Sequence, residues 1–458
     1  MGIVWSRGME QEKTHSSGEH IAYTNGKASQ VVKRCKASAW TPSMLLALER
    51  GVRGGKWFAL IDKVYRMNNL ERSFEQVKKN GGSAGIDRMT VCQYEANLKG
   101  ELDELQFALK TDAYRGQPIK RVYIPKPGSR EKRPLGIPTV RDRIIQGAVR
   151  QVIEPIFEYE FRECSYGFRP ERGCKDALRQ VTKLLEEGML HVVDADIKNF
   201  FGALNHELLM DLVRRRISDG RVLGLIKQFL EQGVMEEGEI RESRQGTPQG
   251  GVISPLLANV YLHELDVKLE DRYKVVRYAD DLVILCRSAE EAAEAMLALG
   301  EVVNELKLEL HPSKTKIISM TQPGARFTFL GYDFVVGKSK LLRYPSKKSS
   351  KKLRQNLKPH TLRNSGQAIE QIVIQVNVRL RGWYEYFKHS SEYGLESLDG
   401  WVRRRLRAIL DQRHRKRHTM GYGSAQKRWT NKYFQSIGLF DMELTRKIEL
   451  TTRYAVKP

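Results

Sequence analysis

Val275–Cys286 has the sequence VVRYADDLVILC, two apolar runs around a short polar break. This pattern is typical of two strands joined by a tight turn, and Asp280 and Asp281 fall at the turn. Adjacent carboxylates repel each other, so keeping both ionised is costly unless a cation lies between them. Mg²⁺ prefers oxygen ligands and suits such a hairpin tip, but a solvated turn rich in Asp has the same pattern. The rest of the chain must separate the two interpretations.

Composition limits the kind of protein. The chain has 458 residues, enough for several domains with a substantial core, and a net charge of +23. A positive excess of this size predicts a polyanionic partner, because each phosphate that Lys or Arg neutralises releases counterions. The content of 18 Tyr, 15 Phe and 6 Trp favours a folded protein over a disordered basic chain.

The 5 cysteines are widely spaced and include no Cys-x-x-Cys pair. We therefore expect neither a disulfide framework nor a zinc site, and a reducing, cytoplasmic setting fits. No apolar run reaches the roughly 18–20 residues of a membrane span, so no membrane partner is expected.

A further acidic position lies on a predicted strand upstream. His191–Ile197 alternates polar and apolar residues, and Asp194 and Asp196 share one face because they are two residues apart. Two aromatic residues, Phe200 and Phe201, follow closely. A metal-binding carboxylate beside an aromatic lid has this pattern, and so does the edge of a core.

Two other segments have the composition of nucleotide-binding elements. Residues 122–138 predict a strand, a turn and a second strand, with Lys126 and Arg133 near the tip. Phosphate recognition needs charge-assisted donors, which this hairpin offers, although an ordinary solvated basic hairpin is the alternative. Gln245–Gly251 is a loop whose glycines allow the backbone to approach a ligand closely, and an apolar helix follows it.

The last quarter of the chain is strongly basic. Residues 338–363 contain ten Lys or Arg and no acid, and residues 401–417 contain eight basic residues against one acid, Asp411. Between them, residues 381–387 form the aromatic cluster RGWYEYF. We predict a helical region that binds nucleic acid, with phosphates on the cations; the aromatic residues either stack on bases or belong to the core.

These elements together match the needs of phosphoryl transfer by two metals. One ion lowers the pKa of the attacking 3′-hydroxyl, the other neutralises the leaving pyrophosphate, and carboxylates hold the ions about 3.5–4 Å apart. The order of the segments resembles the reverse transcriptases encoded by bacterial and organellar group II introns. A single Tyr-x-Asp-Asp is a weak signal, whereas many blocks in one order are specific. The matching blocks are residues 80–87, 133–143, 166–170, 196–201, 245–259, 278–281, 314–315 and 329–332.

The resemblance implies a role for each acidic residue. Asp196, Asp280 and Asp281 would ligate two Mg²⁺ ions, and the backbone carbonyl of Ile197 would be a further ligand. Asp194 would be a neighbour of the site rather than a ligand, a choice that the strand pattern alone leaves open.

The resemblance also implies roles in nucleotide binding. Phe201 would lie against the sugar and clash with a 2′-hydroxyl, which favours deoxynucleotides. Gln249 would line the nucleotide site, and Lys126 and Arg133 would grip the triphosphate. Lys314 would protonate the leaving pyrophosphate as a general acid, unless it is simply a surface lysine.

The fold that the resemblance implies is an α/β right-hand polymerase, with fingers, an antiparallel palm sheet, and an α-helical thumb and maturase region. We expect a poorly ordered segment over 1–40, fingers and palm over 41–335, and the basic helical region over 336–458. Contacts to RNA are expected from basic residues of that region, namely Lys347, Lys348, Lys351, Lys352, Arg403 and Arg404. The chain has no Cys/His-rich His-Asn-His segment, so cleavage of a second DNA strand is not expected.

The expected function is RNA-directed DNA synthesis together with assistance to splicing of the host group II intron, as in retrohoming mobile elements. The expected partners are intron RNA as template, a DNA primer or target, and dNTPs, in the bacterial cytoplasm and on the nucleoid when DNA is the target; dimerisation stays open. One alternative is a splicing maturase without polymerase activity, which the three intact carboxylates disfavour. Another is a free-standing reverse transcriptase in phage defence or DNA repair, which the basic aromatic tail disfavours.

Overall fold

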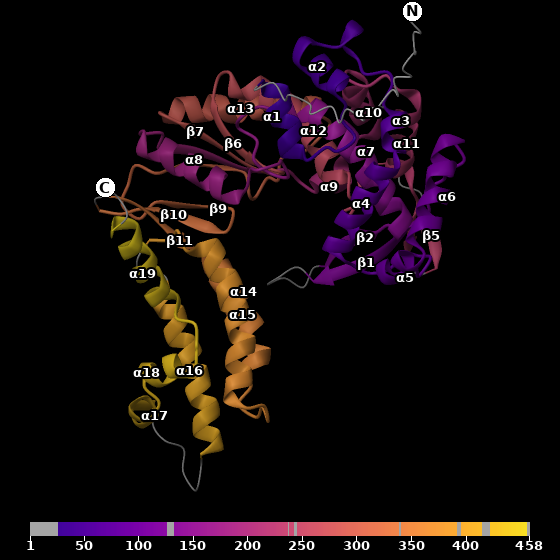
Figure 1. Cartoon of the computed structure of the whole chain (residues 1–458). Coiled ribbons are helices and arrows are strands. Elements are labelled where there is room, and N and C mark those ends of the chain that lie inside the picture. Colours follow the sequence, from indigo (N-terminus) through magenta and orange to yellow (C-terminus); the bar gives the residue numbers. More distant parts are fainter. Residues whose placement is uncertain are drawn as a thin grey trace, which may run out of the picture.

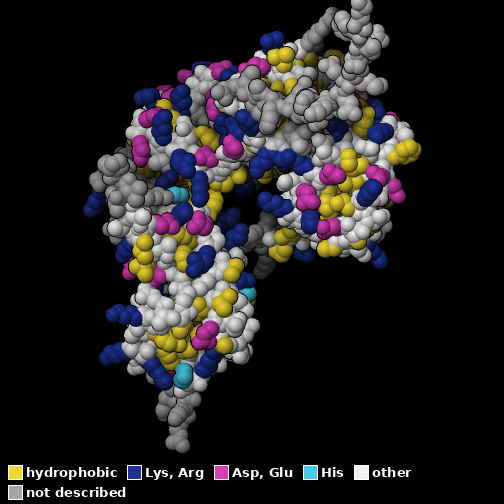
Figure 2. All heavy atoms as spheres, viewed as in Figure 1, with side chains coloured by type: hydrophobic (Ala, Val, Ile, Leu, Met, Phe, Trp, Pro, Cys, Tyr) yellow, Lys and Arg dark blue, Asp and Glu magenta, His cyan; other side chains and the backbone are white. Residues whose placement is uncertain are grey.

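The structure is a computed structural model that describes residues 26–125, 132–236, 238–241, 245–338, 340–391, 395–414 and 422–455. Figure 1 shows an upper block of helices and sheets, coloured indigo to orange, and a helical arm below it, coloured orange to yellow. The two parts enclose an opening that is also visible between the atoms in Figure 2.

The central element of the block is a four-stranded sheet in the order β6-β7-β3-β8, with every neighbouring pair antiparallel. Its strands are β3 (His191–Asp196), β6 (Lys274–Tyr278), β7 (Asp281–Cys286) and β8 (Lys316–Ser319). The structure therefore contains an antiparallel sheet and the hairpin over 275–286, both of which we expected.

Both faces of this sheet are covered, which explains why apolar residues follow one another directly in its strands. Val193 and Ile284 face the large core of the block, where α12 (Ser254–Glu270) and α13 (Ala289–Glu305) pack. Val192 and Val283 face the opposite side, beneath α8 (Cys174–Glu186). Successive residues point to opposite faces of a strand, so a sheet buried on both sides needs a continuous apolar run.

A second sheet, in the order β2-β1-β4-β5, carries the predicted basic hairpin. The two hairpin strands β1 (Ile119–Pro125) and β2 (Lys132–Ile137) are antiparallel, and β1 pairs in parallel with β4 (Val234–Glu236). β5 (Glu239–Arg241) completes the sheet. The other helices of the block are α1 (Lys27–Cys35), α2 (Pro42–Arg50), α3 (Ile61–Val64), α4 (Met67–Asn80), α5 (Val91–Ala96), α6 (Leu98–Lys110), α7 (Val140–Glu158), α9 (Phe200–Ala203), α10 (His206–Arg214) and α11 (Gly220–Glu231), with the 3₁₀ turn η1 (Arg53–Gly55).

A third sheet joins the block to the arm, in the order β11-β10-β9. Its strands are β9 (Arg326–Phe329), β10 (Tyr332–Val336) and β11 (Leu341–Pro345). The arm then consists of α14 (Lys347–Leu357), the 3₁₀ turn η2 (Lys358–Thr361), α15 (Ile369–Phe387), α16 (Leu395–Arg413), α17 (Tyr422–Arg428), α18 (Asn431–Ser436) and α19 (Met442–Ala455). None of the helices in the described ranges is long and apolar enough to cross a membrane.

Two expected boundaries differ from the structure. Residues 27–35, inside the segment 1–40 that we expected to be poorly ordered, form α1, whose Ala28 and Val32 are buried in the main core. The expected boundary at 335 lies inside β10, so the helical arm begins later, at Lys347. Neither error could be avoided from periodicity alone, because α1 is short and mostly polar and β10 pairs on both edges.

The aromatic cluster over 381–387 is part of the core rather than a stacking surface for bases. Tyr384 and Phe387 are buried, and the hydroxyl of Tyr386 donates to the carbonyl of Leu330 at 2.7 Å. The Phe387 ring lies 4.9 Å from the ring of Tyr332, centroid to centroid. The cluster therefore fixes the end of α15 to the third sheet, which holds the arm on the block.

Candidate active site

The register of the central sheet brings the three predicted carboxylates to one end of it. A two-residue turn of Ala279 and Asp280 connects β6 to β7, and Asp281 is the first residue of β7, opposite Tyr278. Across the neighbouring ladder, Asp281 is opposite Asp196, the last residue of β3. Asp196 and Asp281, which are 85 positions apart in the chain, are thus adjacent because two antiparallel pairs share the strand β7.

The charges at this end of the sheet influence one another. Burial raises the pKa of Asp280, and the charge of Asp196 adds to the effect, while Arg133 and Lys314 oppose it. Arg133 is exposed on β2, so the positive charge that acts on the pKa of Asp280 comes from the basic hairpin. The site combines carboxylates from one sheet with a cation from another.

Asp281 is affected more strongly. Burial of its carboxyl and the charges of Asp280, Asp196 and Asp194 raise its pKa to about 6, although much of the residue as a whole is exposed. Asp194 itself has a pKa raised to about 6 by burial, with Lys316 opposing the shift. Concentrated negative charge of this kind favours a bound cation.

A lysine already neutralises one of the carboxylates. Lys314 precedes β8, and its Nζ lies 2.7 Å from Oδ2 of Asp196. The loop before β8 is held there because the N–H of His311 donates to the backbone carbonyl of Asp196 at 2.8 Å. Lys314 therefore lies at the site, as predicted, and its ammonium occupies the position of a counter-ion.

The carboxylates are not yet arranged as a ready-made metal cluster. No group of three or more His, Cys, Asp or Glu side chains within the described ranges lies close enough to hold a metal ion. The donor set nevertheless fits Mg²⁺, which takes carboxylate oxygens. Ile197 is buried beside Asp196, and its isolated bridge to Leu310 fixes the backbone that the resemblance assigns to the metal.

The predicted nucleotide-binding loop docks against α9 and the residue that follows it, and against β2. Gly246 and Thr247 donate their N–H groups to the carbonyls of Leu204 and Phe201, both at 2.7 Å. Gly246 has a φ of +83°, and a Cβ there would lie 2.8 Å from the carbonyl oxygen of Phe201, so only glycine fits. We expected the glycines of this loop to allow the backbone to approach a ligand closely. In the structure, Gly246 approaches the protein's own backbone at Phe201.

Phe201 and Gln249 mark the two contact points of this loop: Phe201 is contacted by Thr247, and Gln249 contacts β2. The Phe201 ring is half-buried, 5.2 Å from the ring of Phe200, and the carbonyl of Gln249 accepts the N–H of Gly136 in β2 at 2.7 Å. The side-chain Oε1 of Gln249 is buried and has no hydrogen-bond partner among the described residues. The loop thus connects α9, which follows the Asp196 strand, to the basic hairpin. Lys126, the other cation predicted at that hairpin, lies outside the described residues.

The residues predicted to contact RNA differ in their surroundings. Lys347, Lys348, Lys351 and Lys352 are all exposed on α14, and Arg404 is exposed on α16. Arg403 instead forms an ion pair with Asp441, 3.1 Å from Nη1 to Oδ2, with 12% of its side chain exposed. That pairing braces α16 against the residue before α19, so Arg403 is not a free RNA contact. Figure 2 shows Lys and Arg side chains along the border of the opening between block and arm.

The sequence analysis missed a group of buried polar residues directly behind the turn. Arg277 is 1% exposed and pairs with the equally buried Asp266 of α12. One signal was available, since an arginine inside an otherwise apolar strand implies a buried partner. Its partners are distant in sequence, so the pattern does not identify them.

Comparison with known proteins assigns both parts of the chain. Residues 124–334 match the family described as "Reverse transcriptase (RNA-dependent DNA polymerase)", and residues 350–429 match "Group II intron, maturase-specific domain". The chain is thus a reverse transcriptase followed by a maturase-specific domain, which supports the right-hand polymerase class.

The relatives agree with this assignment. "Protein YkfC" of Escherichia coli (strain K12) is 35% identical over 302 residues, covering 57% of this chain and 78% of that protein. "Group II intron-encoded protein LtrA" of Lactococcus lactis subsp. cremoris is 33% identical over 298 residues, covering 51% of this chain and 49% of LtrA. The chain belongs to the group II intron-type reverse transcriptases and maturases, as the motif order predicted, and the aligned region spans about half of LtrA.

Proposed function

We propose that this chain copies intron RNA into DNA, with Asp196, Asp280 and Asp281 holding two Mg²⁺ ions, and that its helical arm binds the intron RNA and assists splicing. The observation that supports the proposal best is the register that sets Asp196 opposite Asp281, beside Asp280 in the turn. When bound, the ions would activate the 3′-hydroxyl of a primer and neutralise the leaving pyrophosphate.

Binding of the ions requires that Lys314 release Asp196. The Nζ of Lys314 is 2.7 Å from the Asp196 carboxylate, so the lysine neutralises a charge that a metal would otherwise neutralise. Once released, its ammonium is placed to donate a proton to the leaving pyrophosphate oxygen, the role of a general acid. The half-exposed environment of Lys314 allows this movement, since 56% of the side chain contacts solvent.

The other residues would bind and select the nucleotide. Arg133 of β2, whose charge acts on Asp280, has a guanidinium that can hold triphosphate oxygens by charge-assisted hydrogen bonds, and Lys126 would join it. Phe201, anchored against Phe200, would exclude a 2′-hydroxyl, and the unpartnered Oε1 of Gln249 would accept a hydrogen bond from the substrate. Among the basic residues of the arm, the α14 lysines and Arg404 remain the proposed RNA contacts.

The alternatives are less well supported. A maturase without polymerase activity would have no use for three mutually repelling carboxylates, whose shared position raises the pKa of Asp281. A free-standing reverse transcriptase would need no maturase-specific domain, and residues 350–429 match one.

The proposal is tested by primer extension on an RNA template with dNTPs and Mg²⁺. We expect Asp280→Asn to lower the extension rate by about 10³-fold or more, because metal-assisted stabilisation of the transition state is lost. RNA binding, measured by filter retention, should change little, since the residues proposed to contact RNA lie on α14 and α16 and not on the turn.

Asp194→Asn is the matched control, because Asp194 lies on β3 two residues before Asp196 and shares its face. If Asp194 is a neighbour of the site and not a metal ligand, the Asp194→Asn variant should retain most of the extension activity. If Asp280→Asn extends primers as the wild-type protein does, the metal assignment is wrong; if Asp194→Asn is as inactive as Asp280→Asn, the choice of ligands is wrong.

A further inference from the structure

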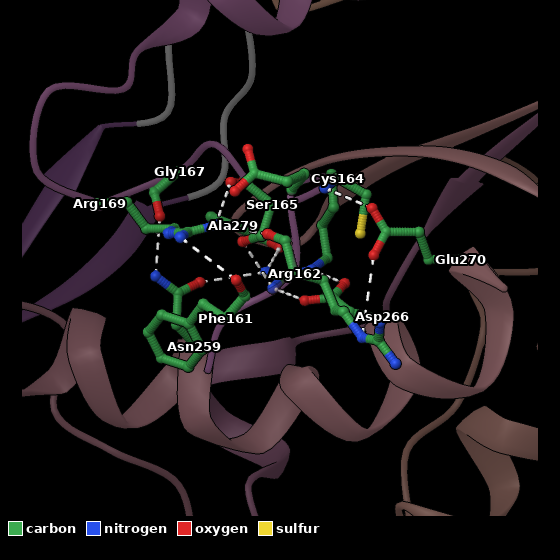
Figure 3. Close-up of polar contacts among 12 residues, drawn as sticks. Phe161, Arg162, Cys164, Ser165, Gly167, Arg169, Asn259, Asp266, Glu270 and Ala279 are labelled. Carbon is green, nitrogen blue, oxygen red and sulfur yellow. Dashed lines mark hydrogen bonds and ion pairs between the residues drawn. The ribbon is translucent and has the colours of Figure 1, made fainter. Parts of the chain in front are cut away.

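The side chain of Arg277 makes the densest set of buried polar contacts near the turn. Its Nε donates to Oδ1 of Asp266 at 2.6 Å, and Nη2 donates to Oδ2 of the same carboxylate and to Oγ of Ser165 at 2.8 Å. Nη1 donates to Oδ1 of Asn259 at 3.1 Å and to the carbonyl of Ala279 at 3.0 Å. All five N–H groups of the guanidinium are therefore used. Figure 3 shows Ser165, Asn259, Asp266 and Ala279 gathered around one point.

One of these contacts reaches the catalytic turn itself. Ala279 adopts a left-handed conformation with φ +57°, which is unfavourable for a residue with a Cβ. The hydrogen bond from Arg277 holds the carbonyl of this residue, and Asp280 follows it directly. Arg277 thereby stabilises the backbone conformation from which Asp280 and Asp281 project.

The segment behind the turn is fixed by the same group of residues. The N–H of Arg277 donates to the carbonyl of Cys164 at 2.8 Å, and Nδ2 of Asn259 donates to the carbonyl of Gly167 at 2.8 Å. A Cβ on Gly167 would lie 2.3 Å from the backbone nitrogen of Ala279, so this segment packs directly against the turn. Two contacts therefore fix the turn: the Arg277 side chain holds the carbonyl of Ala279, and residues 164–167 pack against the backbone nitrogen of Ala279.

We propose that Arg277 is a positioning residue for metal binding: by holding the carbonyl of Ala279 within a fully paired buried network, it sets the Asp280 and Asp281 carboxylates for two metal ions. The inference rests on the proposed function, in which these carboxylates are metal ligands. Metal ligands must be held to within about 0.5 Å, and a turn with an unfavourable residue does not achieve this unaided.

A purely structural role is the competing explanation, because breaking any buried ion pair destabilises a fold. The chain supplies a control in Arg407 of α16, which is 5% exposed against 1% for Arg277. Its Nε donates to the carbonyl of Trp429 at 2.8 Å, and its Nη2 donates to Oδ1 of Asn431 at 2.9 Å. Both acceptors belong to the arm, and neither lies in the turn or in residues 164–167.

The experiment compares Arg277→Lys with Arg407→Lys in the full chain. Lysine keeps the positive charge but has three donors and no planar fork. Mn²⁺ serves as the metal probe, with binding followed by the paramagnetic signal of the free ion, and the midpoint of thermal unfolding is measured without metal. We expect both variants to unfold at similarly lowered temperatures, and only Arg277→Lys to bind Mn²⁺ about tenfold more weakly, in line with a lost hydrogen bond to a charged donor.

If Arg277→Lys does not fold, Mn²⁺ binding is measured with Ser165→Ala instead. It removes a single acceptor of the guanidinium and keeps the ion pair with Asp266. We expect about threefold weaker Mn²⁺ binding than in Ser73→Ala, which removes another buried hydroxyl, on α4 and away from the turn.

The outcomes separate this inference from the proposed function. If the wild-type chain binds no Mn²⁺ and extends no primer, the proposed function fails and the inference with it. If the wild-type chain does both, and Arg277→Lys and Ser165→Ala bind Mn²⁺ within about twofold of their controls, the positioning role alone is refuted.

Discussion

Lys314 lies 2.7 Å from Oδ2 of Asp196 with 56% of its side chain exposed, so it can leave the carboxylate and still reach a substrate at the same end of the sheet. If it is the general acid, Lys314→Gln should lower the rate of nucleotide addition by about 10²-fold. Single-turnover extension with saturating dNTP provides the test, because it measures the addition step itself.

Lys198→Gln is the control for charge removal beside the site. Lys198 follows Asp196 by two residues, is 55% exposed and pairs with Glu309 at 2.9 Å, so it matches Lys314 in exposure but not in its partner. An equal loss of rate in both variants would mean that Lys314 contributes only to the local charge.

At the same scale, the sequence predicted the identities of the site residues better than their surroundings. Asp196, Asp280 and Asp281 could be placed together because strand alternation and the order of the blocks constrain them. The contact between Lys314 and Asp196 depends on how the loop before β8 folds back, which no local pattern records. The ion pair between Arg403 and Asp441 was not predicted, because a basic run does not show which of its members has an acidic partner.

At the scale of elements, Asp399 joins two helices of the arm, α16 and α19, by hydrogen bonds. It lies on α16, 3% exposed, and its carboxylate accepts the N–H groups of Met442 and Glu443 at the start of α19. Burial raises its pKa to about 7, with Asp441 adding to the shift and Arg403 opposing it. The folded arm therefore holds this proton more tightly than the unfolded chain does.

The stabilising contribution of that proton is fully present below about pH 4 and is lost as the pH rises to about 7. The free energy of unfolding should fall by up to about 1.4 kcal/mol per pH unit in this window. Asp399→Asn should flatten the slope, at a pH-independent cost of about 1 kcal/mol for the acceptor that is lost. Urea unfolding followed by tryptophan fluorescence at several pH values measures the slope, and parallel slopes for the two proteins would contradict the assignment.

Elements also show where sequence patterns stop being informative. The motifs predicted the hairpin over 275–286 and the basic hairpin over 122–138, because each is a local pattern of strand, turn and strand. The parallel pairing of β1 with β4 joins segments more than 100 residues apart, and nothing in either strand specifies it. The docking of the Gln245–Gly251 loop on Phe201 and Gly136 is likewise a product of the tertiary fold.

At the scale of the whole molecule, the net charge of +23 is distributed unevenly. The four lysines of α14 are exposed, and residues 338–363 contain no acid to pair with them. They lie at the start of the arm, where Figures 1 and 2 show the opening between arm and block. An RNA that passes along the arm toward the carboxylates would release counterions from its phosphates at these lysines.

Changing Lys347, Lys348, Lys351 and Lys352 to Gln should therefore weaken RNA binding and reduce the slope of log K against log salt concentration by up to about 3, at roughly 0.7 per phosphate contact on a single strand. The matched control changes four lysines that each have an acidic neighbour on the block, namely Lys78, Lys183, Lys227 and Lys268. It removes the same formal charge, so a general effect of net charge would reduce both slopes equally. A smaller slope in the α14 variant alone would assign the contact to the arm, and equal slopes in the two variants would show that the basic run on α14 is not part of the RNA-binding surface.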